Sequence, residues 1–160
     1  MAQIILEESS VPATPNTGYV ALYAKTNGGL YSKTDGGTEY PVSGGATSIT
    51  FTRDMTTATG TQAVTGVGFT PTAIIFVYAI SGTTQEGVGF ADSSKSGRNR
   101  NYLSSTGWFA GTQAISASVS SGNYQIGDVS TYDSDGFTIS WTKAGSPTGT
   151  LTVYALCLRA

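Results

Sequence analysis

The sequence predicts an all-β chain, and three observations support this prediction. Strand-favouring residues (Thr, Val, Ile, Tyr and Phe) recur throughout, and 21 of the 160 residues are glycine, as is typical of strands joined by turns. No window carries apolar residues at the i, i+3, i+4, i+7 spacing of an amphipathic helix. With 39% hydrophobic residues, the chain is apolar enough to bury a core. We expect an N-terminal extended arm and a small β-meander, followed by an antiparallel, jelly-roll-like β-sandwich.

Residues 1–17 form the predicted arm. The stretch EESSVPATPN contains Pro12 and Pro15, and proline favours an extended or polyproline-like backbone over a helix. In an isolated chain such a segment is typical of a disordered tail. The apolar residues Ile4, Ile5 and Leu6 indicate instead an arm that orders against a neighbouring subunit, and both interpretations stay open.

Residues 18–42 contain one eight-residue unit written twice, LYAKTNGG and LYSKTDGG. The dipeptides Asn27-Gly28 and Asp35-Gly36 are strong signals for type I′ hairpin turns, in which both central residues need positive φ. The repeat is therefore predicted to be a three-stranded meander. A phosphate-binding loop fits poorly, because there is no GxxxxGK[ST] pattern and no helix follows. Alternation in the first strand gives an apolar face and a tyrosine face: Val20, Leu22 and Ala24 against Tyr19, Tyr23 and Lys25.

The meander is too short to fold alone, since roughly 40 residues is the usual lower limit for unassisted folding. Its apolar face must be covered by the rest of the chain or by other copies, and an exposed tyrosine face indicates contacts on both sides. We expect oligomerisation around a symmetry axis as the natural solution. The predicted assembly contacts are Ile4, Ile5, Leu6, Tyr19, Leu22, Tyr23, Leu30 and Tyr31.

The stretch SGGATS, residues 43–48, is a predicted linker, and residues 49–160 are the predicted sandwich. The run AIIFVYAI is continuously apolar and predicts a central strand that is buried on both faces. The final strand alternates instead, with Leu151, Val153, Ala155 and Cys157 on one face. Strands are expected at 48–53, 61–66, 73–79, 86–91, 100–105, 113–119, 125–131, 137–142 and 150–158.

Residues for common enzyme chemistry are sparse. The chain has no histidine, and its one cysteine, Cys157, lies in an apolar run that is typical of a buried thiol. Asp133 and Asp135, in YDSDGF, resemble a fragment of a calcium-binding loop. The twelve-residue pattern ending in Glu is absent, however, and Asp-Gly before a strand is ordinary turn chemistry. We expect no catalytic residue, no metal and no cofactor.

Charge and hydropathy exclude further classes. A formal net charge of −2 gives no overall attraction to nucleic acid. No segment has the roughly 18 apolar residues of a membrane span, so we expect no membrane insertion. The first residues carry no basic region ahead of an apolar run, so the expected place of synthesis is the cytoplasm, without a signal peptide.

The stretch SSKSGRNRNY is the one cluster of charge and predicts a binding loop. Arginine donors beside amides and an aromatic ring suit an anionic sugar or a phosphate group, and a nearby tryptophan suits sugar stacking. The alternatives are a solvated loop, or a loop that pairs with acids of a neighbouring subunit, and Trp108 fits a core position equally well. The candidate binding residues are Lys95, Arg98, Arg100, Tyr102 and Trp108.

The chain resembles bacteriophage virion proteins of the fibre and head-decoration type along nearly its whole length. The pattern ILEESSVPATPNTGYVALYAKTNGGLYSKTDGGTEYPV resembles the attachment segment that opens many phage fibre and head-surface proteins. The stretches VTGVGFTPTAIIFVYA, VGFAD, YDSDGFTISWT and LTVYALCL are similar to a β-rich module common in phage structural proteins.

The resemblance implies a non-enzymatic, homotrimeric virion protein. It would dock on capsid or tail subunits through its N-terminal part and display the sandwich outward. It carries no catalytic residue over to this chain. The alternative function is a host-surface adhesin whose displayed domain binds cell-surface polysaccharide.

Overall fold

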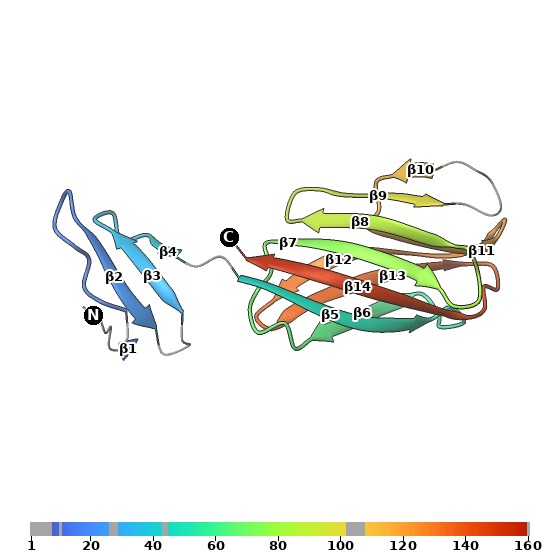
Figure 1. Cartoon of the computed structure of the whole chain (residues 1–160), viewed down its shortest axis with the longest axis horizontal. Helices are drawn as coiled ribbons and strands as arrows, with labels where there is room; N and C mark the ends of the chain where they lie inside the picture. Colours follow the sequence, from blue (N-terminus) through green and yellow to red (C-terminus); the bar gives the residue numbers. More distant parts are fainter. Residues whose placement is uncertain (1–7, 10, 26–28, 43–44, 102–107, 160) are drawn as a thin grey trace, which may run out of the picture. The chain divides into compact units, whose positions relative to one another are not determined.

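The computed structural model describes residues 8–9, 11–25, 29–42, 45–101 and 108–159, and the chain divides into two compact units, residues 1–45 and 46–159 (Figure 1). The described residues form strands and turns without a helix, so the prediction of an all-β chain is confirmed. These ranges contain no helix that is long and apolar enough to cross a membrane.

The first unit is a four-stranded sheet in the order β1-β2-β3-β4. Three antiparallel strands form the predicted meander, and the arm adds a short parallel strand beside β2. The arm is thus part of the sheet of its own chain rather than a separate tail. The strands are β1 (Glu8–Ser9), β2 (Val20–Lys25), β3 (Leu30–Thr34) and β4 (Glu39–Pro41).

The turn between β3 and β4 differs from the predicted type I′ turn. The amide of Gly37 donates to the carbonyl of Thr34 at 2.9 Å, and Thr34 also pairs with Thr38 through a 2.9 Å bond. Positive φ, 81°, occurs at Gly37 and not at Gly36. This is a three-residue loop, residues 35–37, in which a turn is followed by a left-handed glycine. Gly37, the third residue of the loop, therefore determines the turn. Asn27-Gly28 lies outside the described residues.

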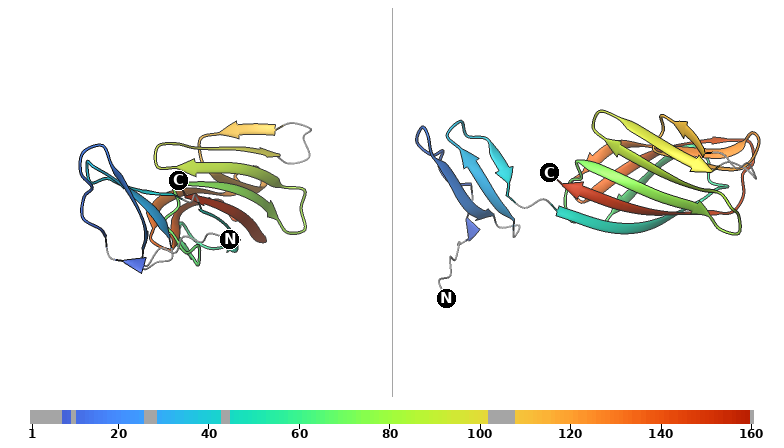
Figure 2. Two further views of the ribbon diagram at one scale, coloured as in Figure 1. Left: turned by 60° about the vertical axis from the view of Figure 1, so that its left-hand side comes forward. Right: turned by 45° about the horizontal axis from the view of Figure 1, so that its top comes forward.

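The second unit is a β-sandwich of two sheets, which Figures 1 and 2 show as two layers. The larger sheet has the order β10-β9-β8-β7-β14-β5, and the smaller has the order β11-β12-β13-β6. The larger sheet contains β5 (Gly45–Asp54), β7 (Ala73–Ile80), β8 (Glu86–Asp92), β9 (Ser96–Asn101), β10 (Trp108–Gly111) and β14 (Thr150–Arg159). The smaller sheet contains β6 (Gly60–Thr65), β11 (Ile115–Ser120), β12 (Asn123–Asp133) and β13 (Gly136–Ala144).

The core fills the space between these two sheets. Alternate residues of β7, β13 and β14 are fully buried and meet there, with the rings of Phe76 and Phe137 packed edge to face at 5.8 Å between centroids. Trp141 belongs to this core, as its place in FTISWT predicts, and its indole donates to Gln62 at 3.1 Å. The antiparallel sandwich predicted for this part of the chain is therefore present.

One buried polar network ties the two sheets together at the edge of the core. The guanidinium of Arg53 on β5 donates to the side-chain oxygen of Gln125 on β12 at 3.0 Å. The amide of Gln125 donates to the carbonyls of Met55 and Thr57 at 2.8 and 2.9 Å. The side chain of Gln125 is fully buried, and each of its polar atoms has a partner. This network holds the turn after β5 against the smaller sheet.

Two predicted boundaries are wrong. The strand predicted at 100–105 is Ser96–Asn101, and a further short strand follows at Trp108–Gly111. Residues 45–48 of the predicted linker belong to β5, although the division between the two units lies beside them. The charge cluster therefore lies largely on a strand and not in a loop.

The prediction for AIIFVYAI is also wrong, because β7 is buried on one face only. Ile74, Phe76, Tyr78 and Ile80 are buried in the core, whereas Ile75, Val77 and Ala79 are exposed. The smaller sheet covers only the inner side of the larger one. Apolar side chains of a central strand therefore face away from the core.

Candidate functional site

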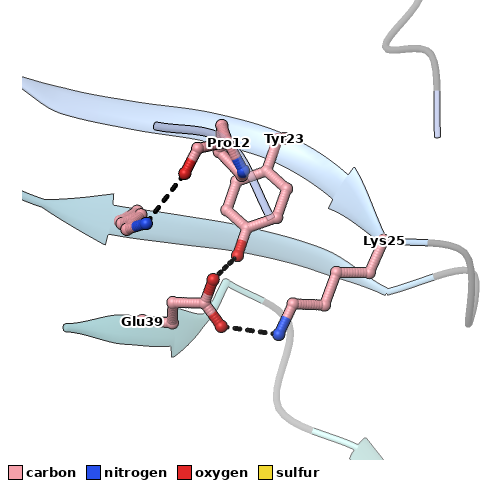
Figure 3. Close-up of polar contacts among 5 residues, drawn as sticks. Pro12, Tyr23, Lys25 and Glu39 are labelled. Carbon is pink, nitrogen blue, oxygen red and sulfur yellow. Dashed lines mark hydrogen bonds and ion pairs between the residues drawn. The ribbon is translucent and has the colours of Figure 1, made fainter. Parts of the chain in front are cut away.

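The first unit has a polar cluster on one face of its sheet (Figure 3). Glu39 accepts a hydrogen bond from the hydroxyl of Tyr23 and forms an ion pair with Lys25 at 2.6 Å. These hydrogen bonds, that of Lys25 foremost, hold the pKa of the Glu39 carboxyl below its ordinary value. The bond to Glu39 raises the pKa of Lys25. The cluster joins β2 to β4, which are not adjacent strands of the sheet.

The arm closes over the same face. Lys33 is buried, and its ammonium donates to the carbonyl of Pro12 at 2.8 Å. The carboxylate of Glu39 bonds to Tyr23, as Figure 3 shows, and Tyr23 is only 6% exposed. The prediction of an exposed tyrosine face is therefore wrong for Tyr23, because groups of the same chain bury it.

The opposite face of the meander is open. Val20 and Leu22 are 62% and 57% exposed. Val42, just after β4, is also exposed. Tyr19, one residue before β2, is 69% exposed, but strand alternation places it on the side of Tyr23. Exposed apolar side chains that lie together are typical of interaction surfaces. We call Val20, Leu22 and Val42 the meander patch.

Leu30 and Tyr31 on β3 are half-buried. Leu30 pairs with Ala24 and shares the face of Leu22, whereas Tyr31 pairs with Tyr23 on the face of the polar cluster. The rings of Tyr31 and Tyr23 are 6.0 Å apart, and the ammonium of Lys25 lies 4.2 Å from the Tyr31 ring centroid. Tyr31 therefore lies next to the polar cluster. Ile4, Ile5 and Leu6 lie outside the described residues.

Of the predicted cations of the second unit, Lys95 and Arg98 are described, and their surroundings differ. Lys95 is exposed in the turn before β9, where the carboxylate of Asp92 accepts three hydrogen bonds from the backbone and hydroxyl of Ser94 and the backbone of Lys95, each at 2.7 Å. These bonds hold the pKa of Asp92 below its ordinary value. Arg98 is half-buried, and its guanidinium donates to the side chain of Gln113.

Three further predicted binding residues are described in part or not at all. Arg100 pairs with Gly87 of β8 and Phe109 of β10, and Trp108 pairs with Asn101. The structure therefore places the backbone of Arg100 and Trp108 on neighbouring strands of the larger sheet. Their side chains, and the whole of Tyr102, lie outside the described part of the chain.

The aspartates of the sandwich bond to turns and strands of the protein. Asp135 accepts hydrogen bonds from the amides of Gly66 and Gly68 at 3.0 and 2.7 Å, which fix one turn against another. Asp133 accepts a bond from Thr138 at 2.9 Å, and Asp128 accepts one from the amide of Ala114 at 2.8 Å. Across the described ranges, His, Cys, Asp and Glu residues form no group of three or more that could hold a metal ion.

Cys157 lies in the core of the sandwich on β14 and is fully buried. Burial raises the pKa of its thiol to about 11, because the thiolate is poorly solvated there. Its position on the inner face matches the predicted alternation of the last strand. A buried and protonated thiol is a packing group and not a nucleophile.

The apolar outward surface of the larger sheet was not predicted from the sequence. Six side chains on β7, β8 and β14 point away from the core and are each at least 40% exposed. They are Ile75, Val77, Val88, Phe90, Tyr154 and Leu156. Isolated exposed apolar residues are ordinary, but a contiguous group marks an interaction surface. We call this surface the outer face.

A hollow adjoins the outer face where the side chains become small. Its volume is about 600 Å³, and residues of β7, β8, β9 and β10 line it. The side of the hollow away from β7 is lined by Gly97, Asn99 and Ala110. The ring of Phe90 lies across Gly97, and a Cβ added to Gly97 would come within 2.8 Å of this ring. Arg98 contributes to the lining, but its guanidinium bonds to Gln113. The hollow is therefore mainly apolar.

Comparisons with protein-family models, with curated proteins and with solved structures found no match to this chain.

Proposed function

We propose that this chain is a non-enzymatic structural protein of a bacteriophage particle, of the head-decoration or fibre type. Residues 1–42 attach it to capsid or tail subunits, and residues 49–160 are displayed outward. The meander patch is the observation that carries the proposal. One face of the first unit exposes three apolar side chains, while the second unit has a complete core of its own.

Burial of the meander patch would contribute substantially to attachment. Full burial of a Val or Leu side chain stabilises by about 1.5–3 kcal/mol, so covering the exposed half of Val20 or Leu22 contributes roughly 1 kcal/mol each. Val42 is exposed on the same face. Several identical copies in an oligomer would add their contacts through effective concentration, so that modest single contacts give firm attachment. We propose three copies, the number that the resemblance to phage fibre and decoration proteins implies.

The polar cluster supports the same role from the opposite side of the sheet. The bonds of Glu39 to Tyr23 and Lys25, and of Lys33 to the carbonyl of Pro12, close that face with groups of the same chain. They hold β2, β3, β4 and the arm in one arrangement. An attachment unit held in this way presents the meander patch without ordering it on contact, which lowers the entropic cost of binding.

The test is co-sedimentation of the purified chain with phage particles assembled without it. The Leu22→Lys variant places a charge in the meander patch and should weaken attachment at least tenfold. The Ala13→Lys variant adds the same charge at an exposed position of the arm and should attach normally. Equal attachment of both variants, or attachment of neither the variants nor the unaltered chain, would refute the proposal.

Binding of cell-surface polysaccharide through Lys95, Arg98, Arg100, Tyr102 and Trp108 stays a prediction. Among these residues, Lys95 is exposed, whereas Arg98 bonds to Gln113. Replacing Arg98 and Arg100 by alanine would weaken cell binding at unchanged thermal stability if these side chains hold a sugar. The loss of the Gln113 bond would instead lower thermal stability if the role of Arg98 is internal.

A further inference from the structure

The outer face is organised as two rows of side chains that cross the larger sheet in register. Tyr154 pairs with Val77, Val77 with Val88, Val88 with Asn99 and Asn99 with Ala110, so one row runs over five strands. The second row runs through Leu156, Ile75, Phe90 and Gly97. Residues that pair directly across strands point to the same side of a sheet, so each row lies on one surface.

The side chains of the rows are large at one end and small at the other. The β14 end begins with Tyr154 and Leu156, which are large and exposed, and we call it the ridge. A smaller hollow of about 250 Å³, lined also by Ser48 and Thr50 of β5, lies beside the ridge. The opposite end consists of Gly97, Asn99 and Ala110, which line the hollow of about 600 Å³. One surface therefore carries both large apolar side chains and a mainly apolar hollow, and large side chains of a second copy fit such a hollow.

The charge of the outer face also suits a second copy. The two rows contain no charged residue, and the neighbouring outward residues of β5, Ser48 and Thr50, are neutral as well. The exposed Glu86, which pairs with Ala79 in the adjacent row, is a charge at the margin of the face. The centres of two such faces meet without repulsion, whereas selection of a different protein usually depends on opposite charges across the interface. A polysaccharide would need several polar groups, and the rows offer one amide, that of Asn99. A copy of the chain is therefore the best-fitting occupant.

The size of the face is adequate for a stable contact. Six strands spaced about 4.8 Å apart, with about seven residues each at roughly 3.3 Å per residue, give the outward surface of the whole larger sheet a footprint of roughly 650 Å². A standard interface covers about 800 Å² on each partner. The outer face lies on three strands at the centre of this surface, and the whole outward surface approaches the area that a specific complex requires.

We infer that a second copy of this chain covers the outer face, with the ridge of one copy seated in the hollow of the next. The contact is compatible with a twofold dimer, and also with a trimer in which each outer face turns toward the symmetry axis. It belongs to the second unit and does not depend on where the first unit attaches.

The first experiment measures self-association of the full chain by analytical ultracentrifugation. Val88→Lys puts a charge at the centre of the outer face and should weaken association at least tenfold. Ser140→Lys is the matched control, because Ser140 is exposed on the smaller sheet. Both positions are solvent-exposed, so the melting temperatures of both variants should stay close to that of the unaltered chain. Equal association of the two variants would overturn the inference.

The second experiment identifies which surfaces meet. Thr152 lies next to Tyr154 along the ridge, and Ala110 lies in the hollow. Cysteines in a Thr152→Cys, Ala110→Cys chain are four strand spacings apart, about 19 Å, so a short bis-maleimide joins them only between copies. Cys157 is buried and does not compete.

Chains linked between copies are expected for this variant on reducing gels, and not for a Thr152→Cys, Ser140→Cys control. Absence of linked chains at a concentration where the protein is oligomeric would overturn the inference. So would loss of cell binding in Val88→Lys without linked chains, because it would assign the face to another macromolecule. Linked chains together with failed particle attachment would refute the attachment proposal alone.

Discussion

The buried network around Gln125 allows a quantitative prediction for the Gln125→Leu variant. The substitution keeps the size of the side chain but leaves the Nε of Arg53 and the carbonyl of Met55 without partners inside the protein. A buried polar group that loses its partner costs about 1–3 kcal/mol, and a charged donor lies at the upper end. Thr57 is exposed, so water replaces its bond at small cost. We expect a loss of about 3–5 kcal/mol in the free energy of unfolding.

The assay is equilibrium unfolding in urea, followed by tryptophan fluorescence and far-UV circular dichroism at one protein concentration. The guanidinium of Arg53 lies 5.3 Å from the Trp141 ring centroid, so the emission of Trp141 reports on the network directly. The matched control is Arg53→Met, Gln125→Leu. Replacing both partners by apolar groups removes the unpaired charge, so the double variant should be more stable than Gln125→Leu alone.

Two results would refute this reasoning. One is a loss below about 1 kcal/mol in Gln125→Leu, which would mean that the network contributes no more than an exposed hydrogen bond. The other is a double variant as unstable as the sum of its single variants, which would show that Arg53 and Gln125 act independently.

Three further predictions concern other parts of the chain. A Cβ on Gly89 would lie 1.7 Å from the carbonyl oxygen of Ala114, so Gly89→Ala should lower the melting temperature by several degrees. Gly36→Ala is the control and should not lower it, because the atom nearest to its added Cβ, the hydroxyl oxygen of Thr34, is 3.8 Å away. The lowered pKa of Glu39 stabilises the first unit above the unfolded pKa of about 4.3, and this contribution is lost as the pH falls through the folded pKa. Near-UV circular dichroism of the tyrosines should therefore show an acid transition that Glu39→Gln removes; an unchanged transition would contradict this origin. The thiol of Cys157, with a pKa of about 11, should react with a thiol reagent at pH 8 only in urea, and stoichiometric reaction of the native protein would contradict its burial.

Sequence patterns predicted the fold well where polar and apolar residues alternate. In β14, Thr152 separates the inward residues Leu151 and Val153, and these two residues are buried as expected. The pattern was uninformative in β7, because all eight residues of the strand are apolar or aromatic and either face could be the inner one. Whether such a strand is buried on one face or on both depends on whether a second layer covers each side of the sheet. The residues of the strand itself do not specify this.

The candidate sites were predictable only in part, for a similar reason. The exposure of Leu22 follows from the small size of the meander, whereas the burial of Tyr23 accompanies its bond to Glu39, sixteen residues away on the chain. The charge cluster was recognisable, but the partner of Arg98 is Gln113, which lies fifteen residues away on the chain. The two rows of the outer face join residues of five strands, and only the register of the strands brings them together.

The position of β14 has a consequence for the synthesis of the protein. This strand follows β5 to β13 along the chain and leaves the ribosome after them, yet it lies inside the larger sheet, between β7 and β5. Until it arrives, β5 lacks its neighbour in the sheet, and β7 lacks its neighbour on that edge. The larger sheet therefore closes only once β14 has been made, and a chain that stops before β14 is left with open strand edges.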